Sequence, residues 1–261
     1  MGILRNFLYL DEDQLNQYIS QVEDGLRQHA ERAISSDKDK KAEVDAKVLK
    51  FGLGRKNVEA ESLNYSDNGP ARFDRLLALV EGVEDEFGWK DLQETQVEMI
   101  SLRPGHVLAC AAELYESDVS KLSAASGILS MLPLMKSISQ MTGKPLQGME
   151  NFDDNTVEAV GAFGAAMKGS SVVLGDILES DWKLVFSIPA GIDVEGDAYV
   201  VGKVSKVWGA GEWRPLPGLP VFSQLPRAQR REMERKGPAP DGKMMWQEGP
   251  AVLLDVLAVY R

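Results

Sequence analysis

His29, His106 and Cys110 are the histidines and the cysteine of this sequence, residue types that often bind zinc or act as nucleophiles. A zinc site needs three or four His, Cys or carboxylate ligands at suitable spacing. Two distant histidines and one cysteine do not form such a set. We therefore predict no metal site, and we expect both histidines to be structural or at the surface.

His106 and Cys110 would form a nucleophile–base pair only if their side chains met. A separation of four residues puts two side chains on one face of a helix. The apolar run around them predicts a strand instead, in which they share a face but lie roughly 13 Å apart. The neighbours of Cys110 are a leucine and three alanines, surroundings that raise the pKa of a thiol. We predict a buried, unreactive Cys110 and no catalytic residue.

Two groups of carboxylates, Asp11–Asp13 and Asp153–Asp154, could support acid–base or metal chemistry. Such chemistry requires acids that converge in a pocket, and proximity in sequence does not establish convergence. Asp11 is better explained as a helix cap, and the acids after it as favoured by the helix dipole. An enzyme with a carboxylate-based site assembled in the fold is therefore an alternative hypothesis.

Glycine-rich segments give no sign of a nucleotide site. Gly52-x-Gly54 lacks the third glycine of a dinucleotide motif, and the sequence contains no P-loop. We predict no cofactor.

Basic and aromatic residues supply the candidate interaction surface. The segment Arg227–Lys236 is rich in arginine but also carries two glutamates, which favours a solvated helix with ion pairs. Its contact with nucleic acid or a membrane surface is a third hypothesis. The tryptophans could stack on bases or cover a sheet edge. The candidate surface comprises Arg55, Lys56, Trp208, Trp213, Arg227, Arg230 and Arg231.

The charge balance favours a protein as the partner. The chain has 40 acidic and 29 basic residues, a net charge of −11. Such a surface repels phosphate backbones and anionic membranes at long range, so nucleic acid is disfavoured. The acidic stretch Glu81–Glu98 is a further candidate partner surface.

Targeting signals are weak or missing. A lone cysteine cannot form an internal disulfide, which fits a reducing compartment. The N-terminus lacks the apolar stretch and cleavage site of a signal peptide. Lysines interrupt the two stretches that resemble membrane spans, Leu122–Met141 and Val157–Leu178, so we expect buried or half-buried segments and no transmembrane span. These features predict a cytoplasmic protein.

Helices and hairpins are predicted in the N-terminal part. Phe7–Leu10 suits a strand, and Asp11 with Gln14 approximates a capping box for a helix from Glu12 to Arg32. The other predicted elements are a hairpin of Val44–Phe51 and Val58–Tyr65 tipped by Arg55 and Lys56, a helix beginning at Asn68-Gly69-Pro70, a hairpin of Thr95–Leu102 with Val107–Tyr115, and a helix from Ser117 or Asp118 towards Met141. A flexible glycine-containing arm is the rival to the first hairpin.

Strands dominate the C-terminal part. The predicted elements are a helix followed by a strand within Val157–Leu178, strands at Trp182–Ile188, Ala198–Trp208 and Ala251–Tyr260, and a helix at Arg227–Lys236 opened by Pro226.

The predicted fold class is α+β, because strands and helices do not alternate regularly. A helix-rich N-terminal region with β-hairpins, residues 1–145, precedes a strand-rich region, residues 156–261. The boundary is expected near Gly143–Asn155, and one continuous domain is the alternative.

Both ends of the chain resemble a known family. Residues Tyr9–Gln21 read YLDEDQLNQYISQ, and Tyr199–Val204 with Gly249–Arg261 contribute YVVGKV and a closing AVYR. These segments are similar to a bacterial protein family catalogued only as a domain of unknown function. The resemblance implies full-length correspondence but supplies no activity and no functional residues.

The sequence thus predicts an uncharacterised bacterial cytoplasmic protein that acts as a non-catalytic interaction or regulatory module.

Overall fold

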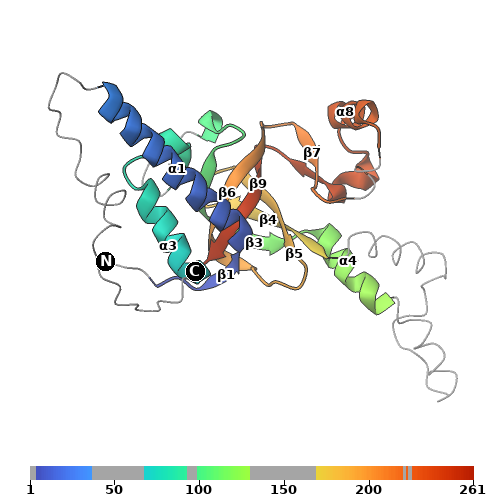
Figure 1. Ribbon diagram of the computed structural model, residues 1–261. Coiled ribbons are helices and arrows are strands. Elements are labelled where there is room, and N and C mark those ends of the chain that lie inside the picture. The colour runs from blue at the N-terminus through green and yellow to red at the C-terminus, as the bar shows by residue number, and fades with distance from the viewer. Residues whose placement is uncertain (1–3, 37–67, 93–98, 130–168, 220–221, 223–224) are drawn as a thin grey trace, which may run out of the picture. The chain divides into compact units, whose positions relative to one another are not determined.

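The computed structural model describes residues 4–36, 68–92, 99–129, 169–219, 222 and 225–261. Helices and strands do not alternate regularly, which confirms the predicted α+β class (Figure 1). The chain divides into two compact units, Leu10–Trp89 and a larger one made of Met1–Tyr9 with Lys90–Arg261. Within the described ranges, no helix is both long enough and apolar enough to cross a membrane.

Helix α1 (Glu12–Ser36) of the smaller unit begins where the sequence predicts. Asp11 Oδ1 accepts a hydrogen bond from the backbone N–H of Gln14 at 2.9 Å, as an N-cap does. The helix continues beyond the predicted end at Arg32. Its buried side chains recur at helical spacing and are Leu15, Ile19 and Val22.

Helix α3 (Gly69–Val80) also begins as predicted, with Asn68 Oδ1 accepting from the backbone N–H of Ala71 at 3.0 Å. A proline follows Gly69 in the first turn, where its missing N–H costs nothing. Leu77 of the predicted apolar face is half-buried, and Leu79 is buried in addition. The other predicted face residues, Phe73, Leu76 and Val80, are buried. A short 3₁₀ helix, η1 (Glu84–Phe87), follows α3.

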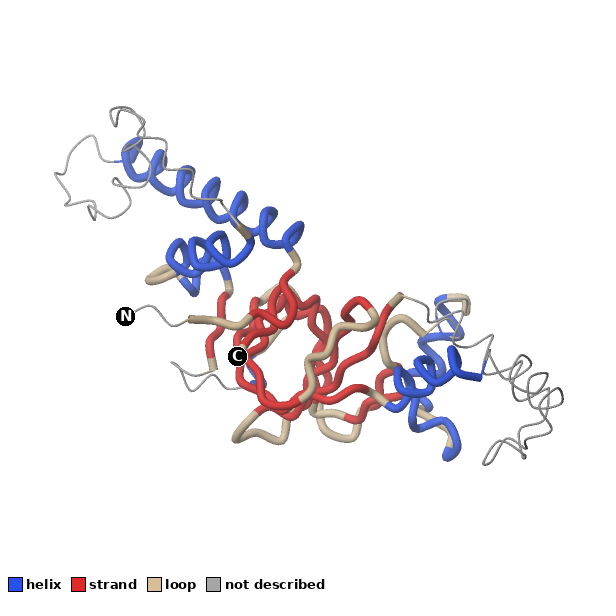
Figure 2. Tube along the Cα trace, turned by 90° about the horizontal axis from the view of Figure 1, so that it is seen from below, coloured by secondary structure: helices blue, strands red, loops and turns tan. Residues whose placement is uncertain are grey.

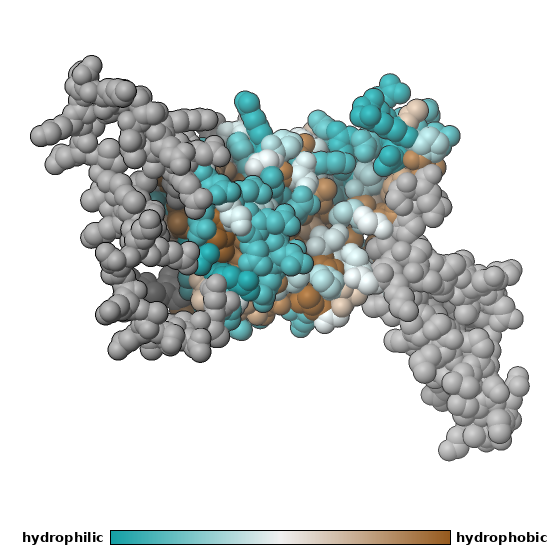
Figure 3. Space-filling view, viewed as in Figure 1, coloured by the Kyte–Doolittle hydropathy of each residue, from teal (hydrophilic) through white to brown (hydrophobic). Residues whose placement is uncertain are grey.

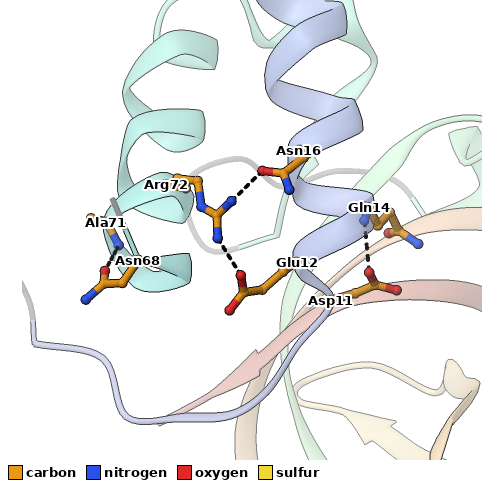
Figure 4. A network of polar contacts seen from close by, with 7 residues as sticks. All are labelled: Asp11, Glu12, Gln14, Asn16, Asn68, Ala71 and Arg72. Carbon is orange, nitrogen blue, oxygen red and sulfur yellow. Dashed lines mark hydrogen bonds and ion pairs between the residues drawn. The ribbon is translucent and has the colours of Figure 1, made fainter. Parts of the chain in front are cut away.

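Polar side chains connect the two helices of the smaller unit (Figure 4). Arg72 of α3 donates to Asn16 of α1 at 2.8 Å and forms an ion pair with Glu12. Further along the helices, Arg75 pairs with Glu23 at 3.4 Å. α1 and α3 are therefore joined by an apolar seam with a polar row beside it.

Five strands of the larger unit form a closed barrel. Around it β3 neighbours β4, β4 neighbours β5, β5 neighbours β9, β9 neighbours β6, and β6 returns to β3. Only the β5–β9 pair is parallel. Figure 2 shows the ring of strands. The strands are β3 (Val107–Glu116), β4 (Ser170–Ile177), β5 (Lys183–Pro189), β6 (Gly196–Trp208) and β9 (Ala251–Tyr260).

Alternate side chains of these strands fill the barrel, as in other small barrels. Two register shifts between β6 and β9 bend the pair, which helps a sheet to close. β1 (Phe7–Leu10) adjoins β9, where Asn6 and Arg261 exchange backbone hydrogen bonds of 2.8 and 3.0 Å. β2 (Trp89–Asp91) adjoins β3.

A second apolar cluster lies outside the barrel. Residues 213–248, which we call the β6–β9 insertion, pack over outward-facing side chains of β4, β5 and β9. The insertion contains β7 (Trp213–Pro215), α8 (Arg227–Lys236), the 3₁₀ helix η3 (Pro240–Met245) and β8 (Trp246–Glu248), and β7 pairs with β8. The buried members of the cluster are Val119, Val172, Val185, Trp208, Leu216, Leu219, Phe222, Trp246 and Ala251.

Helix α4 (Asp118–Leu129) follows β3 and begins at the predicted place. The backbone N–H of Ser120 donates to Ser117 Oγ at 3.3 Å, so Ser117 caps the helix. Ser120 Oγ in turn accepts from the backbone N–H of Val172 at 2.6 Å. This buried hydroxyl attaches the start of α4 to β4.

One predicted hairpin is wrong where its first strand is described. Met99–Ser101, expected within that strand, forms a 3₁₀ helix, η2, and residues 95–98 lie outside the described ranges. The reason is that β3 has no edge left for such a strand: β6 occupies one edge, and β4 with β2 occupies the other. The strand at Val107–Tyr115 itself is confirmed, as are β1, β5, β6, β9, α8 and the strand at the end of Val157–Leu178.

Other predictions fall outside the described residues. These are the hairpin of 44–65 with its Arg55 and Lys56 tip, the course of the helix towards Met141, and the boundary near 143–155. The division into residues 1–145 and 156–261 stays a prediction.

Candidate functional site

The two tryptophans of the candidate surface differ in exposure. Trp208 is 4% exposed and lies in the second apolar cluster, where its Nε1–H donates to the backbone oxygen of Gln247 at 3.3 Å. Trp213 is half-buried, and the Lys243 ammonium lies 5.7 Å from its ring centroid. Trp208 therefore attaches the insertion to the barrel. Trp213 lies on β7, the strand next to α8.

An ion-pair bridge ties α8 to β7. The guanidinium of Arg214 lies 3.0 Å from a Glu212 carboxylate oxygen and 3.6 Å from a Glu234 carboxylate oxygen. Glu234 is on α8, and its side chain is 28% exposed. The bridge is partly screened from water, so it positions the helix more firmly than a fully exposed pair would.

Local signals set both ends of α8. Pro226 stands at the N-cap, and Gly237 at the C-cap has φ 71°, a left-handed value that glycine adopts without steric cost. The backbone N–H of Gly237 closes the last turn on the Met233 oxygen at 2.9 Å. A Cβ on Gly237 would touch the ring of Trp213 at 3.8 Å, so the helix ends against that side chain.

No side chain of α8 is buried, although the helix is anchored at its C-terminal end. Arg227, Arg230 and Arg231 are exposed, and their spacing of three and four residues puts them on one face. Figure 3 shows hydrophilic colour over this part of the molecule, at the upper right, where Figure 1 labels α8.

The two acids of α8 already have basic partners. Glu232 pairs with Lys236 at 2.7 Å, and that hydrogen bond lowers the pKa of the Glu232 carboxyl. Glu234 pairs with Arg214, as described above. Within the described ranges no hydrogen bond or ion pair holds the side chain of Arg227, Arg230 or Arg231, so their charge faces solvent.

Residues with catalytic potential lie elsewhere. Cys110 is fully buried in the barrel, and burial together with the nearby Asp91 charge raises the pKa of its thiol to about 12. Its burial is as predicted. Across the part of the chain that the structure describes, no three His, Cys, Asp or Glu side chains gather as a metal site.

A polar group on β3, β4 and β5 was not predicted. Tyr115 donates to Asp176 at 3.2 Å, and Lys183 pairs with the same carboxylate oxygen at 2.7 Å. Burial, followed by the Asp176 charge and hydrogen bond, raises the pKa of Tyr115 to about 12. The side chains of Asp176 and Lys183 are 43% and 36% exposed, so the group lies on an open face. Only the strand register brings these residues together, and the sequence carries no signal of it.

The strand order defines the class of the larger unit. Numbered along the chain, its barrel strands follow the order 1-2-3-5-4-1 with strands 3 and 5 parallel, which is the topology of an OB barrel. OB barrels bind ligands on the face of strands 2 and 3 and on the loops 1–2 and 4–5. Here strands 2 and 3 are β4 and β5, and loop 4–5 contains the β6–β9 insertion.

The chain belongs to the family described as Domain of unknown function (DUF6414), whose model matches residues 4–260. The predicted family resemblance is thus confirmed over nearly the whole chain. Neither a curated protein nor a solved structure matches the sequence significantly.

Proposed function

We propose that this protein is a non-catalytic interaction module in which an OB-type barrel presents helix α8 to a protein partner. The observation that carries the proposal is a helix with no buried side chain, closed at its C-terminal end by Gly237 and tied to β7 by Arg214. An ordered helix that contributes nothing to a core is well suited to docking, because little conformational entropy is lost when it binds.

The usual ligand face of the barrel supports the same conclusion. Val172 of β4 and Val185 of β5 point out of the barrel, yet they are buried against the insertion. The insertion therefore covers the part of that face around Val172 and Val185, whereas Asp176 and Lys183 on the same face stay 43% and 36% exposed. The insertion also holds α8, so the helix lies beside the covered part of the usual ligand face.

The alternatives have less support. A carboxylate-based enzyme would use acids that converge in a cleft, whereas Asp176 lies on an open sheet face. Base stacking would use exposed aromatic rings, whereas Trp208, Trp246 and Phe222 are at most 8% exposed. A bacterial origin and a cytoplasmic location complete the proposal. The resemblance to a bacterial family supports the origin, and a single cysteine, which suits a reducing compartment, supports the location.

Site-specific photo-crosslinking tests the proposal. A photoreactive residue replaces Ala228, an exposed position on α8, in the full-length chain expressed in its native host. The matched control places the same residue at Lys203, an exposed position on β6. We expect a discrete adduct from position 228 that is absent at position 203 and is lost when Arg227, Arg230 and Arg231 become glutamine. Equal adducts at both positions, or adducts that survive the arginine changes, would contradict the proposal.

A further inference from the structure

The pairing of charges on α8 indicates what kind of partner fits it. The helix has five basic and two acidic side chains. Its glutamates are occupied by Lys236 and Arg214, at 2.7 and 3.6 Å. The arginines at 227, 230 and 231 therefore keep an uncompensated charge in one patch.

The spacing of the three arginines and the shape of the guanidinium group indicate which chemical group on a partner would pair with them. Side chains three and four residues apart on a helix have Cβ atoms about 5–6 Å apart. Each guanidinium offers a planar fork that matches a carboxylate with two parallel hydrogen bonds. Arg227 lies about one turn before both Arg230 and Arg231, so the three side chains form a compact patch that closely spaced carboxylates of one segment can contact.

The rest of the molecule opposes a long polyanion. The chain carries a net charge of −11, so a nucleic acid that extended beyond α8 would meet a repulsive field. A short acidic segment can contact these three arginines without reaching the rest of the acidic surface. Of the aromatic rings of the insertion, Phe222 and Trp246 are at most 8% exposed and provide no platform for bases, and Trp213 is half-buried with Lys243 near its ring.

From these observations we infer that the partner binds through an Asp- and Glu-rich protein segment whose carboxylates pair with Arg227, Arg230 and Arg231. The inference rests on the proposed function, because it assumes that α8 is the docking surface.

Fluorescence anisotropy with the full-length chain tests this specificity. The probes are a labelled peptide of about 20 residues with glutamate at every third or fourth position, long enough to form a helix, its glutamine counterpart, a single-stranded DNA and a DNA duplex. The variant R227Q/R230Q/R231Q is compared with R103Q/K203Q/K206Q, which removes the same charge from exposed positions outside α8. Circular dichroism verifies that both variants are folded.

We expect the acidic peptide to bind the unmodified chain and the glutamine peptide not to bind. Added salt should weaken the binding. The α8 variant should lose about tenfold in affinity, since three exposed ion pairs each contribute a factor of about two. The control variant should retain the affinity.

The other outcomes separate the inference from the proposed function. Tighter binding of either DNA than of the acidic peptide, lost in the α8 variant, would overturn the inference and identify nucleic acid as the partner. Failure of the acidic peptide, with the α8 crosslink intact, would overturn the inference but leave α8 as the docking surface. An equal loss in both variants would show a net-charge effect and overturn the inference. Loss of the crosslink as well would remove the proposed function.

Discussion

Cys110 shows how burial decides the chemistry of a single residue. Its side chain has no exposed surface, and its thiol pKa is raised to about 12, chiefly because burial disfavours the thiolate. Since the thiolate is the reactive form, both access and ionisation protect the residue.

A thiol-labelling experiment checks this protection. We expect no reaction of Cys110 with a water-soluble thiol reagent at pH 8 in the folded chain, and one equivalent after denaturation. Mass spectrometry of the native and denatured samples measures the difference. Fast native labelling would mean that the barrel interior opens frequently.

Tyr115 allows a prediction about pH. Its folded pKa is raised from 10.0 to about 12, by burial first and by Asp176 second. The neutral phenol is thus the form that the fold favours. Its contribution to stability is complete below pH 10 and is lost as the pH rises towards 12, because the unfolded chain ionises first.

Ultraviolet titration of the phenol measures this shift. Replacement D176N removes the charge and the carboxylate that accepts from Tyr115, so the Tyr115 pKa should fall part of the way towards 10.0, with burial keeping the remainder. Subtraction of the Y115F titration isolates this tyrosine from the others. An unchanged titration in D176N would show that Asp176 does not hold the phenol.

Helix ends were predictable from sequence at the scale of elements because their signals are local. Asp11, Asn68 and Pro226 each mark the first turn of a helix that the structure contains. Only half of the predicted capping box forms: Asp11 accepts from Gln14, and Gln14 Oε1 has no hydrogen-bond partner in the described part of the chain.

Pairing between distant strands was not predictable. The sequence predicted β5 and β9 as strands, but their parallel pairing joins Lys183–Phe186 to Ala251–Leu254 across a long separation. The candidate site was likewise predictable only in its local features. The arginines of α8 were predicted to lie on a solvated helix, whereas the Arg214 bridge and the burial of Trp208 depend on contacts between distant segments.

Gly249, between β8 and β9, provides a test at the scale of elements. A Cβ at this position would lie 2.2 Å from the backbone oxygen of Gly209 and 2.7 Å from Trp208. Backbone cannot yield as a flexible side chain can, so G249A should lower the free energy of unfolding by roughly 1–3 kcal/mol or more. Denaturant unfolding measures the change.

Gly209 supplies the matched control for this substitution. A Cβ there meets nothing within 4 Å, so G209A should leave the free energy of unfolding within about 0.5 kcal/mol of the parent. A similar effect of both substitutions on the free energy of unfolding would mean that the close approach of Gly249 to the Gly209 backbone is not the cause of the loss in G249A.

At the scale of the larger unit, the second apolar cluster makes the barrel and the insertion depend on one another. Val172 and Val185 contribute from the barrel, and Leu216, Phe222 and Trp246 contribute from the insertion. Neither side can expose its share without loss of hydrophobic stabilisation. We therefore expect this unit to unfold as one, with the insertion attached.

The substitution W246A tests this coupling. Trp246 is 7% exposed, and its ring packs edge-on against Phe222 at 5.3 Å. Removal of a buried tryptophan costs about 3–5 kcal/mol, which should lower Tm by roughly 10 °C for a unit of this size. Thermal circular dichroism should still show a single transition for the unit. Proteolytic cleavage of the insertion in W246A, with the strand signal still melting at the parental temperature, would contradict this coupling. The insertion, including α8, would then unfold independently of the barrel.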